Sequence, residues 1–239
     1  MSPRKLSHLW IVLAVGSLAA PAAHASFHFM QIEQVMGGVC GDATAQAIQL
    51  RMRASGQNLV SARRLIAYDA AGANPVVLIT FPGNVSSSAG GSRILVTSTA
   101  FSGLLSPPTA DFTLTNLIPP SYLAAGRLVF EDGFGTVYWS LSWGGAAYTG
   151  STTGATDNDA DGIFGPSYAG ALPSLMEALL FPGSFSSAST NNAADYVLTS
   201  GGPTFTNNAG SSGMLVIDCP IFTDGFESGN TSMWSSTVP

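Results

Sequence analysis

Residues 48–53 read IQLRMR, so apolar and polar side chains alternate strictly along this stretch. Successive side chains of a β-strand point to opposite faces, and a period of two therefore predicts a strand with one apolar and one polar face. A helix is the alternative, because Asp42 could cap an alanine- and glutamine-rich stretch that stops at Gly56. At helical spacing Leu50 would point away from its apolar neighbours at positions 48 and 52, so the alternation favours the strand.

The same alternation recurs along the chain. Residues 137–143 read VYWSLSW, and shorter apolar runs are separated by clusters of Gly, Pro, Asn and Ser, which is typical of antiparallel β proteins. Further strands are predicted at 30–35, 64–68, 76–81, 93–97, 112–115, 127–130, 196–199 and 214–218. The sequence therefore predicts an all-β fold, an antiparallel β-sandwich of about ten strands.

One segment carries a helix pattern. Ser174 and Glu177 fit a capping box, and Phe181-Pro182-Gly183 would end the run. We expect one short helix near 174–180, of about two turns. The alternative is an apolar loop that crosses the end of the sandwich.

Four segments in the first half carry a family resemblance. They are MQIEQV at 30–35, AQAIQL at 45–50, FPGNV at 81–85 and GGSRILV at 90–96. Together they resemble the lamin-tail domain, an immunoglobulin-like β-sandwich that also occurs in exported bacterial proteins. Gln49 departs from the family's usual glutamate, and no Gly-Trp pair occurs near 62–65. The resemblance extends over residues 30–101 and implies an immunoglobulin-like scaffold or binding module with no catalytic residues to carry over.

The first 25 residues have the pattern of a secretory signal peptide. Arg4 and Lys5 precede an apolar run at 9–20, and Ala23-His24-Ala25 supplies small residues at the cleavage position. This run is too short to span a bilayer, which takes roughly 20 residues. We expect a secreted protein, extracellular or periplasmic, without membrane insertion once residues 1–25 are removed.

The mature chain is expected to divide into a β-sandwich domain at 26–219 and a C-terminal tail at 220–239. The tail contains DGFESGN at 224–230, which resembles a short ending of many exported bacterial proteins. It is either a sorting extension or, as the alternative, a final edge strand or a frayed terminus.

Cys40 and Cys219 are the two cysteines of the chain. In an oxidising compartment we expect them to form a disulfide, whereas the alternative is two buried free thiols. The pair would close a loop around almost the whole domain. Two cysteines without histidine partners cannot complete a zinc shell.

The charge balance argues against nucleic-acid binding. After residue 25 the chain has six arginines and no lysine against 14 acidic residues, a net charge of −8 by counting. A nucleic-acid partner requires clustered cations. The pairs Arg51/Arg53 and Arg63/Arg64 are instead expected on the solvent faces of strands.

Histidine is scarce, which argues against most acid–base enzymes. His28 is the sole histidine after residue 25, and it lies beside the expected mature terminus. A nucleophile needs a rigidly held base, so we expect no enzyme of that type. A carboxylate-dependent hydrolase is the alternative that survives, although Glu131 and Asp132 would point to opposite faces of a strand.

Asp157, Asp159 and Asp161, followed by Gly162, form a D-x-D-x-D-G run. Carboxylates at alternate positions can wrap calcium in oxygen ligands. The EF-hand is excluded because its twelfth position would be Tyr168. We expect either a single-loop calcium site or a solvated acidic loop.

Trp139 and Trp143 lie on one face of the predicted strand 137–143. If that face were open, they could stack on a sugar, and a carbohydrate-binding module is the corresponding alternative. Their neighbours Val137 and Leu141 favour a core face, which leaves Tyr138 and Tyr148 as the candidate exposed aromatics.

Together the patterns predict an exported, non-catalytic scaffold or binding module for an unknown extracellular or surface partner.

Overall fold

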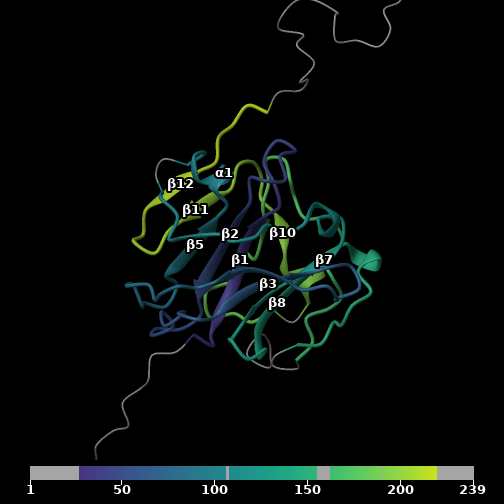
Figure 1. The fold of residues 1–239 in the computed structure, drawn as a ribbon, viewed down its shortest axis with the longest axis horizontal. Helices are drawn as coiled ribbons and strands as arrows, with labels where there is room; N and C mark the ends of the chain where they lie inside the picture. The colour runs from purple at the N-terminus through teal and green to yellow at the C-terminus, as the bar shows by residue number, and fades with distance from the viewer. Residues whose placement is uncertain (1–26, 106–107, 155–161, 190, 220–239) are drawn as a thin grey trace, which may run out of the picture.

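The computed structural model describes residues 27–105, 108–154, 162–189 and 191–219. Its strands are β1 (Met30–Met36), β2 (Ala47–Met52), β3 (Arg64–Tyr68), β4 (Val76–Thr80), β5 (Arg93–Thr97), β6 (Phe112–Thr113), β7 (Gly126–Glu131), β8 (Val137–Trp143), β9 (Leu179–Leu180), β10 (Val197–Leu198), β11 (Thr204–Thr206) and β12 (Ser212–Met214). The helical elements are α1 (Thr99–Ser102), α2 (Asn192–Asp195) and the 3-10 turns η1 (Pro120–Tyr122) and η2 (Gly145–Ala147). The predicted all-β class is confirmed (Figure 1).

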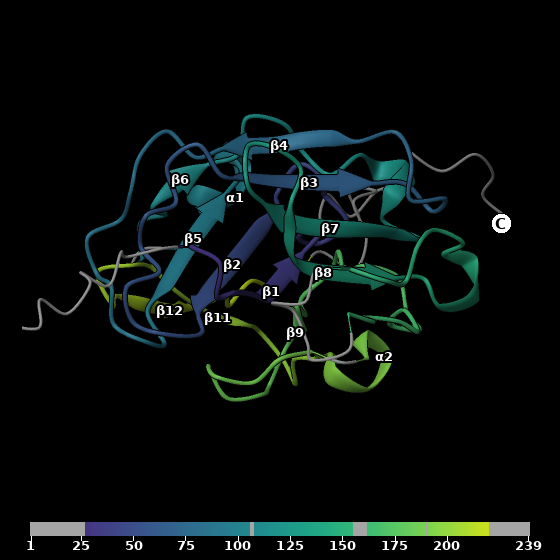
Figure 2. The same ribbon diagram turned by 90° about the horizontal axis from the view of Figure 1, so that it is seen from below.

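Two packed sheets form the sandwich. One has six strands in the order β10-β9-β1-β2-β5-β6, and the other has four in the order β4-β3-β7-β8. Neighbouring strands are antiparallel except β5 and β6, which are parallel. Figure 2 shows the four-stranded sheet on one side of β1, β2 and β5, and the β11–β12 hairpin on the other side.

The main hydrophobic cluster fills the space between the two sheets, and the period of two explains its composition. Alternate side chains of each strand point inward, so every inward position of β2 and β5 is aliphatic or Met. The six-stranded sheet contributes Met30, Ile32, Val35, Ile48, Leu50, Met52, Ile94 and Val96, and the four-stranded sheet contributes Leu65, Ala67, Leu128, Phe130, Trp139, Leu141 and Trp143.

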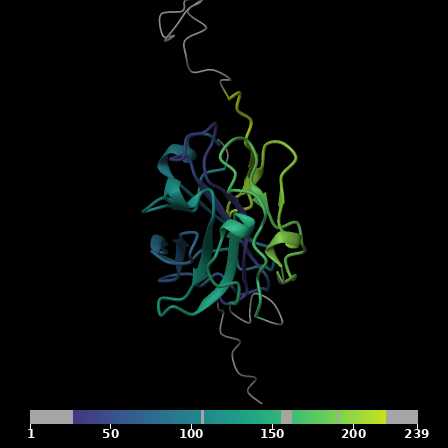
Figure 3. The same ribbon diagram turned by 90° about the vertical axis from the view of Figure 1, so that its right-hand side faces the viewer.

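The other face of the six-stranded sheet is covered as well. Gln49 and Arg51 lie on that face, yet Gln49 is 1% exposed and Arg51 is 8% exposed. The prediction that this face of residues 48–53 meets solvent is therefore wrong. The covering residues come from the C-terminal part of the chain, coloured green to yellow along one side of the molecule in Figure 3. We call residues 181–189 and 203–215 the C-terminal layer.

A second, smaller hydrophobic cluster lies under the C-terminal layer. Phe101 of α1 and Phe205 of β11 meet edge to face there, with ring centroids 5.4 Å apart. Leu95 and Leu215 complete its centre. Burial of such side chains stabilises the fold by about 1.5–3 kcal/mol each, so the layer packs as part of the domain.

A β-bulge in β1 allows one strand to serve both faces. Glu33 is the extra residue between Ile32 and Gln34 in the pairing with β2. The extra residue shifts the alternation by one position. Ile32 and Val35 consequently both face the main cluster, whereas Met36 belongs to the cluster under the C-terminal layer.

The helix predicted near 174–180 does not form. Residues 173–178 have no regular structure, and β9 (Leu179–Leu180) follows them, paired with β1 and β10. The carbonyls of Pro173, Ser174 and Leu175 accept N–H groups from residues 37–41. Because a helix would need the same carbonyls, these long-range bonds override the local capping pattern.

The C-terminal strands depart most from the predictions. A strand was predicted at 214–218, whereas β12 covers Ser212–Met214 and overlaps that prediction only at Met214. The sequence did not predict β11. β11 and β12 pair with each other as a short antiparallel hairpin. Within the described residues, no helix is long and apolar enough to cross a membrane.

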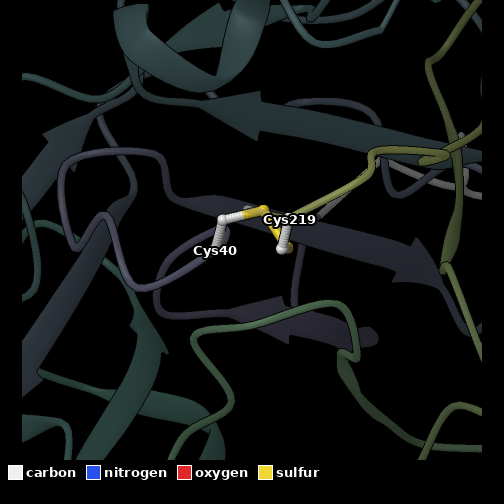
Figure 4. The surroundings of a disulfide bond; sticks show 2 residues. All are labelled: Cys40 and Cys219. Atoms are coloured by element: carbon white, nitrogen blue, oxygen red, sulfur yellow. A yellow bond between two sulfur atoms is a disulfide. The ribbon is translucent and has the colours of Figure 1, made fainter. Parts of the chain in front are cut away.

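The predicted disulfide between Cys40 and Cys219 is confirmed (Figure 4), with the two Cα atoms 5.2 Å apart. Cys40 lies in the loop after β1, and Cys219 follows the C-terminal layer. The bond therefore ties the end of the layer to the sheet that it covers.

Replacing both cysteines by serine, Cys40→Ser with Cys219→Ser, is expected to lower the free energy of unfolding by about 5 kcal/mol, because the bond joins residues 179 positions apart. Urea denaturation measures the change. A reductant should destabilise the natural chain equally and leave the double variant unaffected. A natural chain indifferent to reductant would contradict the role assigned to this bond.

Candidate functional site

The larger of two buried ionic groups in the described chain centres on Glu33. Its carboxylate accepts from Arg51 Nη1 at 2.9 Å, from Arg93 Nε at 2.7 Å and Nη2 at 2.9 Å, and from Gln49 Nε2 at 2.8 Å. The Glu33 side chain is 4% exposed. Burial lowers the pKa of the Arg51 guanidinium, and the Glu33 charge opposes that shift.

This ionic group continues into the C-terminal layer. Arg51 Nη2 donates to the carbonyl of Gly183 at 2.6 Å, and Gln49 Oε1 accepts from the N–H of Thr206 at 2.5 Å. Further bonds join Gln31 to the carbonyls of Ser184 and Ser187, and Gln34 to the carbonyl of Thr204. The polar face of the sheet thus supplies the hydrogen bonds that hold the layer in place.

All six arginines of the described chain point into structural contacts, so the prediction that Arg51, Arg53, Arg63 and Arg64 lie on solvent faces is wrong. Arg64 forms an ion pair with Glu131. Arg63 lies 3.7 Å from the centroid of the Phe27 ring, Arg53 lies 5.6 Å from that of Trp139, and Arg127 lies 4.8 Å from that of Phe164. The faces of aromatic rings attract guanidinium groups, and the aliphatic part of an arginine side chain can pack on apolar surface at the same time.

The carboxylates of Glu131 and Asp132 have separate structural partners. Glu131 is buried beside Arg64, and burial raises its pKa against the opposing effect of that guanidinium. Asp132 accepts the N–H groups of Phe134 and Thr136 and so closes the turn between β7 and β8. The two side chains serve different contacts, because β7 ends at Glu131 and Asp132 already belongs to the turn.

Trp139 and Trp143 are both buried, which confirms the core interpretation of that face. Trp139 Nε1 donates to Tyr196 Oη at 2.7 Å, and Trp143 Nε1 donates to the carbonyl of Tyr122 at 2.9 Å. Each indole is therefore satisfied within the core and presents no ring to solvent.

Tyr138 and Tyr148, the predicted exposed aromatics, are also buried, at 8% and 6% exposure. Tyr138 stacks on His28 with ring centroids 4.6 Å apart, and Phe27 meets it edge-on. The start of the domain thus covers this ring, an effect that local alternation could not reveal. Tyr148 Oη donates to the carbonyl of Ser151.

Asp157, Asp159 and Asp161 lie outside the described residues, so the calcium prediction is untested. Among the residues that are described, no three His, Cys, Asp or Glu side chains gather as a metal site would require.

Open depressions mark the described surface. A groove of about 430 Å³ runs beside β10 at the edge of the six-stranded sheet, between Val197, Leu198 and Pro203. A depression of about 340 Å³ lies beside α1. A third, of about 330 Å³, is lined in part by Asp111, and we call it the Asp111 pocket.

The Asp111 pocket is assembled from three distant segments. Asn84, Val85 and Ser86 come from the turn after β4, Asp111 and Phe112 from the start of β6, and Asn208 and Ala209 from the turn between β11 and β12. The Asp111 carboxylate accepts the N–H of Leu95 at 2.8 Å and that of Asn208 at 2.9 Å. Burial raises the pKa of Asp111, and these two N–H groups oppose the rise.

Sequence reasoning missed this pocket. Its only sequence signal is an isolated aspartate before a short apolar run, a pattern without specificity.

No protein-family model matches the chain, and a comparison with curated proteins finds no match.

Glu33→Gln is expected to lower the free energy of unfolding by about 3 kcal/mol, because two inward-pointing guanidinium groups lose their counter-charge. Denaturant unfolding followed by tryptophan fluorescence measures it. Glu177→Gln, a half-buried acid outside this ionic group, is the matched control and should change stability by less than about 0.5 kcal/mol. Equal effects of the two variants would argue against a structural role for the Glu33 charge.

Trypsin is expected to leave residues 27–219 of the folded, oxidised protein intact. Cleavage requires an accessible, locally unfolded arginine, and none of the six arginines in the described ranges is exposed. Chymotrypsin is the control, since Phe134 is 92% exposed in the turn after β7. Mass spectrometry of timed digests distinguishes the outcomes, and an early tryptic cut in the folded protein would refute the expectation.

Proposed function

We propose that the protein is an exported, non-catalytic scaffold or binding module that acts on an extracellular or surface partner. One observation carries the proposal: the buried ionic side chains of the described residues, Glu33, Arg51, Glu131 and Asp132, all have structural partners. Glu33 is bound by two arginines, and Glu131 by a third. A general acid or base needs a titratable group aimed at substrate, whereas these groups are engaged in holding the sheets together.

The proposal of export rests on two features. Residues 1–25 have the pattern of a leader, and the disulfide suits an oxidising compartment. Calcium binding by Asp157, Asp159 and Asp161 stays a prediction of the sequence.

The lamin-tail resemblance supports a scaffold role of the immunoglobulin-like kind. Three of the four resembling segments coincide with β1, β2 and β5, which are neighbours in the six-stranded sheet. The resemblance therefore falls on a contiguous part of the fold and not on scattered strands.

The two alternatives have less support. A carbohydrate-binding module needs open aromatic rings, whereas Trp139 and Trp143 are buried. A carboxylate-dependent hydrolase needs two acids across a cleft, whereas Glu131 pairs with Arg64 and Asp132 closes a turn.

A binding experiment tests the proposed function. Because the chain has no lysine after residue 25, amine-reactive dye labels only the N-terminal amine of the mature protein. We expect export of the full chain with cleavage before Ser26, and saturable binding of the labelled product to cell envelopes that unlabelled protein displaces. Retention of the leader, unsaturable binding, or turnover of a chromogenic glycoside would contradict the proposal.

A further inference from the structure

We propose that the Asp111 pocket binds the cationic end of a lysine or arginine side chain presented by a protein partner. The inference rests on the proposed function as a binding module, and it names the chemistry that one of its surfaces recognises.

Asp111 is a partly buried carboxylate without a cation beside it. Glu33 and Glu131, two more deeply buried acids, each contact arginine. The partners of Asp111 in the described structure are the backbone N–H groups of Leu95 and Asn208. A partly desolvated carboxylate binds an ammonium or guanidinium group more strongly than an exposed one does, so a ligand cation would supply the missing charge.

The remaining lining of the pocket suits the same ligand. Phe112 lines the pocket and is half-buried, and its ring packs edge-on against Phe81 with centroids 5.2 Å apart. Aromatic faces attract ammonium and guanidinium groups. Asn84 and Ser86 lie at the exposed rim and carry amide and hydroxyl oxygens that accept hydrogen bonds.

The pocket is organised before a ligand arrives. Asn208 is buried, accepts the N–H of Ser87 at 2.7 Å and donates to the carbonyl of Arg93 at 3.0 Å. The Asn208 side chain thus fixes the turn between β11 and β12 against β5. The backbone N–H of the same residue binds the Asp111 carboxylate. A pre-organised carboxylate loses little entropy on binding.

The charge of the whole molecule favours the same class of partner. The arginines of the described chain are occupied by carboxylates and aromatic rings, so no basic patch competes for the pocket or repels a basic partner. The net charge of −8 after residue 25, from six arginines and 14 acids, attracts cationic surfaces.

Amide NMR on ¹⁵N-labelled mature protein tests the proposal with three probes: Nα-acetyl-lysine amide, Nα-acetyl-arginine amide and the neutral Nα-acetyl-glutamine amide. We expect saturable shifts of the Leu95 and Asn208 amides with at least one cationic probe and none with the neutral one. Added salt should weaken the effect. Asp111→Asn should weaken binding at least about tenfold, whereas Asp42→Asn, which neutralises an exposed acid elsewhere, should leave it unchanged.

A second variant covers the case in which Asp111→Asn fails to fold. Ser86→Arg places a guanidinium at the exposed rim, where it should occupy the carboxylate and abolish binding of the probe without disturbing the core. The proposal is overturned if neither cationic probe shifts these amides, if the neutral probe binds equally, or if the folded variants keep their affinity. If the Asp111→Asn and Ser86→Arg variants still bind cell envelopes saturably, the proposed role of the pocket is rejected. The proposed function as a binding module is then unaffected.

Discussion

A carboxylate buried on a sheet face needs charged or hydrogen-bonding partners buried with it, and this constraint organises the molecule. Glu33 occupies the bulge of β1, where Arg51 of the adjacent strand β2 and Arg93 of β5, one strand further along the sheet, reach its carboxylate. Arg51 has a further N–H group that needs an acceptor, and the C-terminal layer supplies the carbonyl of Gly183. The ionic group therefore requires the C-terminal layer above it. With that layer the two-sheet sandwich becomes a domain of three layers.

The layer depends more on specific polar bonds than on regular structure. Its strands β11 and β12 have only three residues each. Gln31 and Gln34 donate to carbonyls of the layer, Gln49 accepts the N–H of Thr206, and the disulfide fastens the chain just after the layer. The Asp111 pocket lies where this layer meets the first half of the chain, so the same contacts that complete the fold create the proposed recognition surface.

Sequence reasoning succeeded wherever the determinant was local. Alternation located β2 and β8 nearly to the residue, and apolar runs located β3 and β5. The apolar side chains that alternate along β8 also assigned Trp139 and Trp143 to the core. Sequence reasoning failed where a distant segment decides the outcome. Arg51 looks solvent-facing until Gly183 covers it, and Ser174 looks like a helix cap until its carbonyl accepts the N–H of Gly41. The Asp111 pocket needs three segments that only the folded chain brings together.

The closing contacts of the domain join its earliest and latest residues. Tyr196 Oη donates to the carbonyl of Ile32, 164 positions away, and Thr206 binds Gln49 across 157 positions. A chain emerging from the ribosome therefore carries β1 and β2 with one face uncovered until nearly all of residues 27–219 have been made. Such high contact order delays folding and suits a polypeptide that is translocated unfolded and matures afterwards.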